Sequence, residues 1–221
     1  MQRQLEPELM ESEEQVAAYA RADFSEAHEL FISNIRTQLK KDFKGSALDL
    51  GCGPGDISQR FARYFPDCLV DAVDGSKPML KYAKLILPEE LTKRICLIHA
   101  YLPSDSLPLK NYEVIVSNSL LHHLPEPAVL WQTIQHYSQA GTQVFIMDLL
   151  RPENRDEAKS LMQHYAAGEP EILRHDFYHS LLAAFTLAEI QTQLERAHLN
   201  LNVQQISDRH VYIAGEITSD S

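Results

Sequence analysis

Residues 47–56 read Ala-Leu-Asp-Leu-Gly-Cys-Gly-Pro-Gly-Asp, a short apolar run followed by glycine at every second position. Beyond them, Ile57, Phe61 and Phe65 recur at helical spacing. The pattern predicts a strand, a tight glycine turn and a helix. Glycine has no Cβ, so the turn can adopt positive φ and approach a ligand, to which the helix presents its free N–H groups. An ordinary tight connection between strand and helix is the alternative interpretation.

Two acidic residues favour a binding role for this turn. Asp49 lies inside the apolar run, where a carboxylate needs a donor or a cation. Asp74 ends the next apolar run, nineteen positions after Gly55, close to the spacing at which a second-strand carboxylate binds ribose hydroxyls. The dinucleotide pattern G-x-G-x-x-G fails because Asp56 stands where the third glycine would be. What remains, D-x-G-x-G-x-G and a later acid, resembles the first two motifs of class I S-adenosylmethionine-dependent methyltransferases.

The resemblance covers roughly residues 45–150 and has consequences for fold and function. It implies an α/β fold with a doubly wound, Rossmann-like sheet, mostly parallel with an antiparallel last strand, and an N-terminal helical cover. It implies S-adenosyl-L-methionine as the cofactor and in-line transfer of its methyl group to a small-molecule acceptor. The chain is similar to the small-molecule branch near the ubiquinone and menaquinone biosynthesis methyltransferases. We expect a helical arm or lid over residues 1–42 and a methyltransferase domain over 43–221, with a lid insertion at about 153–185.

The motifs also assign cofactor contacts. In the family's second motif the acid, here Asp74, takes both ribose hydroxyls and Met79 flanks the adenine, although core packing is an alternative for Met79. An acid that many members carry near Ala100 is absent, so Tyr101, Asp105 or main-chain amides are the possible substitutes. Polar residues end the strand that follows Tyr112, at the edge where open α/β sheets bind ligands. The predicted cofactor-binding residues are Asp49, Gly51, Cys52, Gly53, Gly55, Asp74, Gly75, Met79, Ala100, Tyr101, Ser117 and Asn118.

The catalytic residues are assigned less narrowly than the cofactor contacts. A general base is needed only if the acceptor still carries a proton. The candidates are His28, His123, Asp148 and Tyr178. Neighbouring residues on a helix diverge by about 100°, so we expect His123 alone of the pair 122–123 to approach the ligand, and no metal site. Asp148 ends a strand, where it could orient the acceptor or take a proton; an ion pair with Arg151 is the alternative.

Composition limits the partners. The 221 residues carry 31 acidic and 20 basic side chains, for a formal net charge of -11, which disfavours a nucleic-acid partner. The three cysteines lack C-x-x-C spacing, and no apolar stretch is long enough for a membrane span. We therefore expect a cytoplasmic monomer or homodimer that acts on a small molecule and does not insert into a membrane.

Several segments outside the motifs carry further expectations. Residues 1–12 are acidic and aperiodic and are expected to form a loose arm, whereas a helical pattern begins at Glu13. Tyr19 and Phe24 are lid candidates, with core packing as the alternative. Residues 171–185 lack simple periodicity and are dense in aromatic and ionisable side chains, as expected of a pocket wall. A capping-box pattern at 186–189 predicts a helix, and residues 201–206 and 211–217 predict two closing strands.

Two other functions remain open at this point. A nicotinamide-dependent oxidoreductase shares the fold but needs the third glycine that this chain lacks. A non-catalytic adenosyl-binding subunit that regulates a partner would keep the cofactor site and lack a usable acceptor pocket.

Overall fold

The structure is a computed structural model that describes residues 1–6, 12–104, 107–108 and 111–219. Its centre is a sheet with the strand order β3-β2-β1-β4-β5-β7-β6. Strands β1 to β5 are parallel, whereas β7 runs antiparallel to β5 and to β6. The strands are β1 (Ser46–Leu50), β2 (Leu69–Asp74), β3 (Ile95–His99), β4 (Val114–Asn118), β5 (Gln143–Leu149), β6 (Asn202–Gln205) and β7 (His210–Glu216). The sequence-based prediction of a doubly wound sheet with an antiparallel last strand is confirmed.

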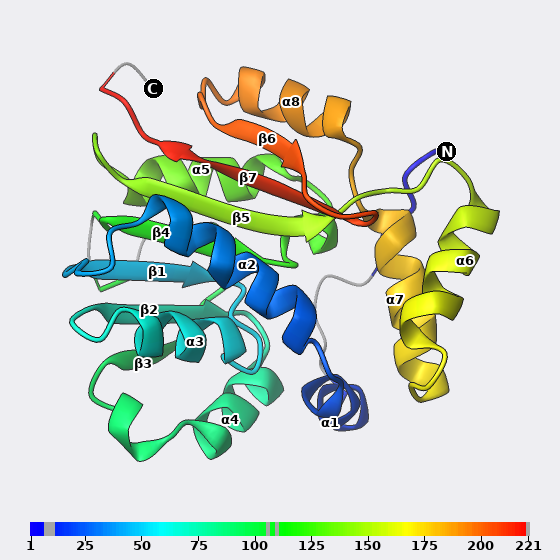
Figure 1. Cartoon of the computed structure of the whole chain (residues 1–221), viewed down its shortest axis with the longest axis horizontal. Helices are drawn as coiled ribbons and strands as arrows, with labels where there is room; N and C mark the ends of the chain where they lie inside the picture. Colours follow the sequence, from blue (N-terminus) through cyan, green and yellow to red (C-terminus); the bar gives the residue numbers. More distant parts are fainter. Residues whose placement is uncertain (7–11, 105–106, 109–110, 220–221) are drawn as a thin grey trace.

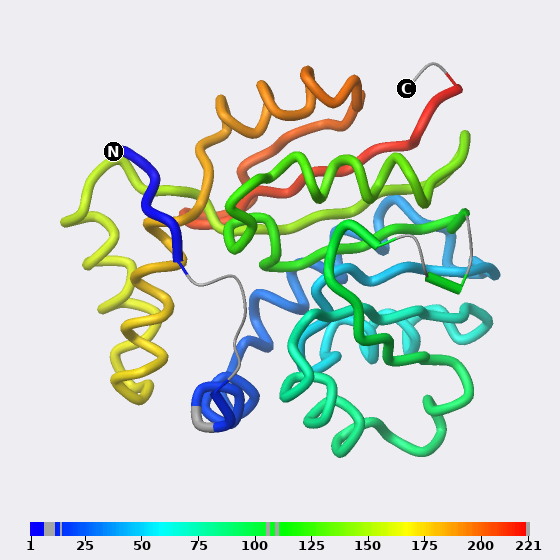
Figure 2. The backbone as a smooth tube through the Cα atoms, turned by 180° about the vertical axis from the view of Figure 1, so that it is seen from behind, coloured from blue at the N-terminus to red at the C-terminus, as the bar shows by residue number. Residues whose placement is uncertain are grey.

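Helices cover both faces of this sheet and its carboxyl edge (Figure 1). They are α1 (Glu13–Arg21), α2 (Ser25–Gln38), α3 (Asp56–Tyr64), α4 (Lys77–Ile86), α5 (Ala128–Tyr137), α6 (Arg155–Ala166), α7 (Glu171–Ala183) and α8 (Leu187–Arg196), with short 3-10 turns η1 (Glu89–Leu91) and η2 (Leu121–His123). α2 and α3 lie on one face, and the view from behind shows α5 and α8 on the other (Figure 2). α1, α6 and α7 stand beyond the ends of the parallel strands.

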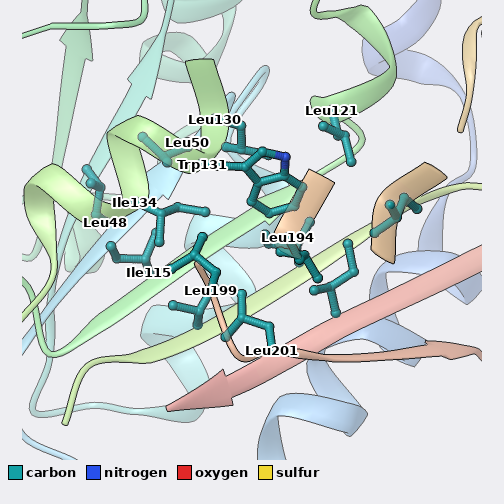
Figure 3. Close-up of a cluster of buried hydrophobic side chains, with 14 of the residues drawn as sticks. Leu48, Leu50, Ile115, Leu121, Leu130, Trp131, Ile134, Leu194, Leu199 and Leu201 are labelled. Atoms are coloured by element: carbon teal, nitrogen blue, oxygen red, sulfur yellow. The ribbon is translucent and has the colours of Figure 1, made fainter. Parts of the chain in front are cut away.

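The sheet separates two apolar cores. On one face, Trp131 of α5 and Leu194 of α8 pack on Leu48, Leu50 and Ile115 (Figure 3). On the other face, the side chains include Phe31, Phe61, Phe65 and Phe145. The central strands are buried on both sides, which explains why their sequences read as continuous apolar runs instead of alternating ones.

Local capping signals mark helix starts as the sequence predicts. The Thr186 side chain and Glu189 form the reciprocal capping box of α8, and Ser76 accepts from the Met79 amide at 3.2 Å at the start of α4. The lack of simple periodicity in residues 171–185 does not mark an irregular segment, because residues 171–183 form the regular helix α7. Its periodicity is obscured because α7 contacts α6 on one side and η2 on another. In the described residues, no helix has the length and hydropathy of a membrane span.

We predict that the core on the Phe145 face carries a large part of the stability. Phe145 is fully buried in β5, so Phe145→Ala should lower the free energy of unfolding by about 3–5 kcal/mol through lost packing and a residual cavity. Urea denaturation followed by circular dichroism measures the change. Leu85→Ala is the matched control, because the Leu85 side chain is 80% exposed and its truncation should change stability by less than about 0.5 kcal/mol. Equal effects of the two truncations would contradict this assignment of the core.

Candidate active site

The glycine turn after β1 is held against the end of β2 by its own main chain. Gly51 and Gly53 have φ values of 73° and 52°, in the left-handed region. The amides of Gly51 and Cys52 both donate to the Val73 carbonyl at 2.9 Å, and the Gly53 amide donates to Asp74 Oδ2 at 2.8 Å. The turn therefore brings Gly53 and Asp74 together.

A cavity of about 340 Å³ opens at this turn. Tyr19, Phe24 and Leu120 contribute to its wall beside the predicted residues. The predicted cofactor residues that line it are Asp49, Gly51, Cys52, Gly53, Asp74, Gly75, Met79, Ala100, Tyr101 and Asn118. Ser117 is not among the lining residues; it is fully buried and donates to the Leu50 carbonyl at 2.9 Å. Gly55 caps the start of α3 in the left-handed conformation and is likewise outside the lining.

The polar groups of this cavity favour an adenosyl ligand. Burial raises the pKa of Asp74, and amides of Ser76 and Gly53 hold its two oxygens and counter that rise. Each carboxylate oxygen retains a lone pair for a hydroxyl of a ligand. Asn118 Oδ1, at the end of β4, is buried and has no hydrogen-bond partner among the described residues. A buried amide oxygen that receives no hydrogen bond favours a ligand that can donate one from an N–H group.

The part of the cavity that was expected to receive the adenine differs from the prediction. The Ala100 amide donates to the Asp74 carbonyl at 3.2 Å, so it is already engaged by the protein. The Tyr101 side chain lines the cavity and is 54% exposed. Asp105, the other possible substitute for the missing acid, lies outside the described residues.

A second cavity of about 210 Å³ adjoins the first. It lies between the ends of β4 and β5 and the helices α1, α2 and α7, and its wall includes Met147, Phe177 and His210. The two cavities share lining residues, among them Tyr19, Phe24, His28, Asn118, Ser119 and His123. A ligand in either cavity therefore lies next to a ligand in the other.

Two of the four catalytic candidates belong to this shared wall. His28 and His123 line both cavities, whereas Asp148 and Tyr178 line neither. Tyr178 packs against the cluster formed by Leu149, Ala158, Leu181, Leu182 and Ala184. His28 Nδ1 lies 2.6 Å from Asp56 Oδ2, and its side chain is 12% exposed. Asp56 thus fixes the orientation of the His28 ring, a contact that the sequence did not indicate.

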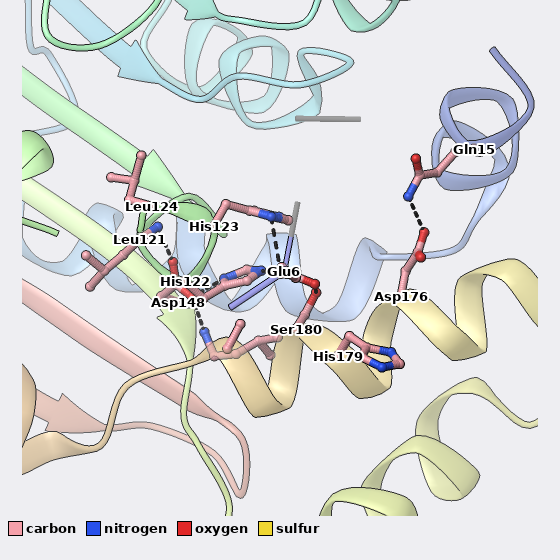
Figure 4. A network of polar contacts seen from close by, with 12 residues as sticks. Glu6, Gln15, Leu121, His122, His123, Leu124, Asp148, Asp176, His179 and Ser180 are labelled. Atoms are coloured by element: carbon pink, nitrogen blue, oxygen red, sulfur yellow. Dashed lines mark hydrogen bonds and ion pairs between the residues drawn. The ribbon is translucent and has the colours of Figure 1, made fainter. Parts of the chain in front are cut away.

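Asp148 pairs with a histidine and not with Arg151. Its Oδ1 lies 2.5 Å from His122 Nδ1, and its Oδ2 accepts the Leu121 amide at 2.7 Å (Figure 4). Burial opposes both charges, but the pair holds the pKa of Asp148 below and that of His122 above its ordinary value. Arg151 instead binds Glu189 at 2.6 Å, so the alternative of an Asp148–Arg151 ion pair was wrong.

The expected divergence of the adjacent histidines was also wrong. His122 and His123 lie on the 3-10 turn η2, and their ring centroids are 4.2 Å apart. Both rings approach the carboxylate of Glu6 (Figure 4). The step of a 3-10 turn, about 120° per residue, also separates neighbours, so the rings come together because both side chains turn toward Glu6.

Residues 1–6 are not a loose arm. Arg3 Nη2 donates to the carbonyls of His122 and Leu124, both at 2.9 Å, and Arg3 Nε donates to the Ala183 carbonyl. The guanidinium also lies 3.9 Å over the ring of Phe185. Sequence reasoning missed Arg3 and Glu6 because an aperiodic acidic segment carries no signal for contacts with distant parts of the chain. Residues 7–11, the rest of the predicted arm, are outside the described residues.

Asp49 occupies the buried position expected from the sequence. Its side chain is 1% exposed, and Ser58 Oγ binds its Oδ2 at 2.5 Å. Burial raises the pKa of Asp49 to about 7, with the Ser58 hydrogen bond acting in the opposite direction. The Ser58 hydroxyl is thus the hydrogen-bond donor that we expected for Asp49 from its place in an apolar run.

Comparison with known proteins agrees with this geometry. Residues 47–141 match the family described as a methyltransferase domain. An uncharacterized methyltransferase of Mycobacterium tuberculosis (strain ATCC 25618 / H37Rv) is 27% identical over 133 residues, which are 60% of this chain and 65% of that protein. A trans-aconitate 2-methyltransferase of Variovorax paradoxus (strain S110) is 32% identical over 127 residues, 56% of this chain and 45% of that protein. The matches thus span less than two-thirds of these relatives' lengths.

Solved structures extend the likeness to the whole fold. The plantazolicin methyltransferase BpumL, in complex with a triazolic desmethyl analogue and S-adenosylhomocysteine, superposes with a TM-score of 0.66 at 16% identity, covering 92% of this chain and 90% of that one. A SAM-dependent methyltransferase from Aquifex aeolicus gives 0.65 at 16% identity and covers 93% and 99%. Residues 47–141 therefore resemble a methyltransferase domain, and the chain as a whole shares the Rossmann-like fold of these solved methyltransferases.

The buried Asp49 leads to a prediction about pH. Its folded pKa of about 7 lies above the ordinary 3.8, so between these values the folded chain keeps a proton that the unfolded chain releases, and stability falls as pH rises. Asp49→Asn removes the pH-dependent contribution of this carboxyl group to stability. Relative to wild type, the variant should gain roughly 2 kcal/mol of unfolding free energy between pH 5 and pH 7. Urea denaturation of both proteins at each pH measures it, and a difference that does not change with pH would refute the buried protonated carboxyl.

Proposed function

We propose that this chain binds S-adenosyl-L-methionine in the first cavity and transfers its methyl group to a small molecule held in the second. The observation that carries the proposal is the shared wall, because methyl transfer requires the donor and acceptor to lie side by side. The activity of the whole chain is part of this proposal. The same holds for the substrates and partners of the chain.

The first cavity fits the cofactor on several counts. A Cβ built on Gly53 would meet no protein atom within 4 Å, so the space beside this main chain is open to a ligand. Asp74 is available to the ribose hydroxyls, and the buried Asn118 Oδ1 to the amino group of the methionine portion. Met79 is 5% exposed and lines the same cavity, which suits contact with a flat apolar base.

The bound sulfonium supplies an electrophilic methyl group with a neutral leaving group. The protein then mainly has to align the two ligands and exclude water, which can account for roughly 7–11 kcal/mol of the barrier. Tyr19 and Phe24 lie in the shared wall with their ring centroids 4.7 Å apart. We propose that α1, the start of α2, and α7 form the lid over the acceptor, within the predicted segments 1–42 and 153–185.

His28 is the best-supported proton acceptor for this reaction. Its Nδ1 is held by Asp56 at 2.6 Å, which leaves Nε2 as the ring nitrogen available to an acceptor group. Asp56 is in turn held by Arg60 at 2.6 Å, and both residues line the first cavity beside His28, where they orient its ring. We propose that His28 takes the proton when the acceptor is a hydroxyl, amine or thiol.

The acceptor class can be narrowed to small polar molecules. The second cavity has a mixed wall with apolar Met147 and Phe177 and the ionisable groups Arg209 and His210. Two classes suit it: phenolic ring compounds, as for the quinone-biosynthesis enzymes that the motifs resemble, and small carboxylic acids, as in the name of the trans-aconitate relatives.

We further propose that the protein is a cytoplasmic monomer or homodimer and that its substrate is not a nucleic acid.

A screen with methyl-labelled cofactor tests the activity directly. The chain is incubated with metabolite extract, phenolic compounds and small acids including trans-aconitate, and labelled products are identified by mass spectrometry. A labelled small molecule supports the proposal. Binding of S-adenosylhomocysteine without any labelled product would instead favour the regulatory subunit, and binding of NADH in its place would favour the oxidoreductase.

Gly53→Ala should weaken S-adenosylhomocysteine binding at least 10-fold in calorimetric titration, because the added methyl enters the space beside the ligand. Gly141→Ala is the matched control. Both glycines have positive φ and no atom within 4 Å of a built Cβ, so each substitution adds a methyl group in open space on a left-handed backbone, but Gly141 lies outside the cavities. Equal affinities of the two variants would remove the turn from the cofactor site.

His28→Gln should lower kcat about 100-fold or more for an acceptor that loses a proton, the usual range for a general base. The exposed His136 on α5 is the control position, and His136→Gln should retain the wild-type kcat. Steady-state assays with the acceptor found in the screen measure both. A His28→Gln variant with wild-type kcat would rule out the base.

A further inference from the structure

A compact group of three metal-ligating side chains lies beside the second cavity. Glu6 Oε1 is 3.2 Å from His123 Nδ1 and 3.5 Å from His122 Nε2 (Figure 4). One ligand atom from each of the three residues lies within 4.8 Å of the other two. The side chains of Glu6, His122 and His123 are 8%, 3% and 16% exposed, respectively.

These separations suit ligands of a single cation. Ring nitrogens and carboxylate oxygens bind Zn²⁺ at about 2.0–2.2 Å, which places neighbouring ligand atoms about 3.0–3.5 Å apart in tetrahedral or octahedral coordination. Glu6 Oε1 is also buried without a hydrogen-bond partner in the described residues. The other oxygen, Oε2, accepts from Ser180 Oγ at 3.2 Å.

Residues behind the group fix its orientation. Asp148 binds His122 Nδ1 at 2.5 Å, which turns His122 Nε2 toward Glu6. A carboxylate that binds the second nitrogen of a ligand histidine is the usual support in metal sites. The hydrogen bonds from the Arg3 guanidinium to the carbonyls of His122, Leu124 and Ala183 anchor the segment that carries Glu6.

We propose that Glu6, His122 and His123 bind one divalent transition-metal ion. Two imidazoles and one carboxylate are a ligand set that suits first-row ions such as Zn²⁺ and Fe²⁺, whereas Mg²⁺ and Ca²⁺ prefer oxygen ligands alone. The binding of the ion depends on these side chains and not on methyl transfer.

The position gives the ion a use within the proposed function. His122 and His123 line the second cavity, so the ion lies at its wall with coordination positions left for another ligand. An acceptor oxygen or sulfur bound there would lose its proton more readily. The acceptor is therefore expected to carry a hydroxyl, carboxylate or thiol that can bind a metal.

Metal titration of the untagged full chain tests the site. Zn²⁺ is titrated by calorimetry, and Co²⁺ by its visible absorption, which reports nitrogen and oxygen coordination. We expect one ion per chain, with affinity lowered at least 10-fold in Glu6→Gln and in His123→Ala. His175→Ala is the matched control. His175 is exposed on α7, and its ring centroid lies 4.0 Å from that of the half-buried His179, so the two are a second pair of adjacent histidines outside the proposed site. This variant should retain wild-type affinity.

S-adenosylhomocysteine binding separates this proposal from the proposed function. Glu6 lies outside the lining of the first cavity, so Glu6→Gln should bind S-adenosylhomocysteine as wild type does, which also shows that it is folded. If the wild type binds S-adenosylhomocysteine but no Zn²⁺ or Co²⁺ at millimolar concentration, the metal site is refuted and the cofactor site stands. Loss of metal binding in His175→Ala, with retention in Glu6→Gln and His123→Ala, would also refute it.

Discussion

The hydrogen bond from the Gly53 amide to Asp74 joins the turn after β1 to the end of β2, and the shape of the first cavity depends on it. It combines a glycine at positive φ in the turn with a carboxylate at the end of the neighbouring strand. Parallel pairing of Leu50 with Val73 places the two strand ends at the same edge of the sheet. Because both partners are fixed by the sheet, the cavity needs little rearrangement of the main chain to receive a ligand.

The second cavity is built differently. Its floor is the edge formed by Asn118 and Met147, but its remaining wall comes from α1, α2 and α7. Two of its histidines are held by carboxylates, His28 by Asp56 and His122 by Asp148. Such pairs keep imidazole rings oriented in a partly buried place, where an unpaired charge would be costly. The proton chemistry and the metal site proposed above both rely on this arrangement.

The two cavities differ in how far the sequence predicts them. The glycine turn, Asp74 and the order of strands and helices follow from local patterns, because spacing along one strand or helix determines them. Ser117 was misplaced because periodicity does not say which strand-end residue faces inward; its side chain turns to the Leu50 carbonyl. The place of Glu6 and the joint orientation of His122 and His123 depend on contacts between segments distant in the sequence, which no local pattern encodes.

The wall over the acceptor has a consequence for how such a chain can diversify. α1, α7 and residues 1–6 lie outside the stretch 47–141 that matches the methyltransferase domain. Mutations in these peripheral parts can reshape the second cavity while leaving the strand ends at the first cavity unchanged. If the two cavities hold acceptor and donor as proposed, acceptor specificity can be exchanged as a module, by evolution or by a protein engineer, with the donor half left intact.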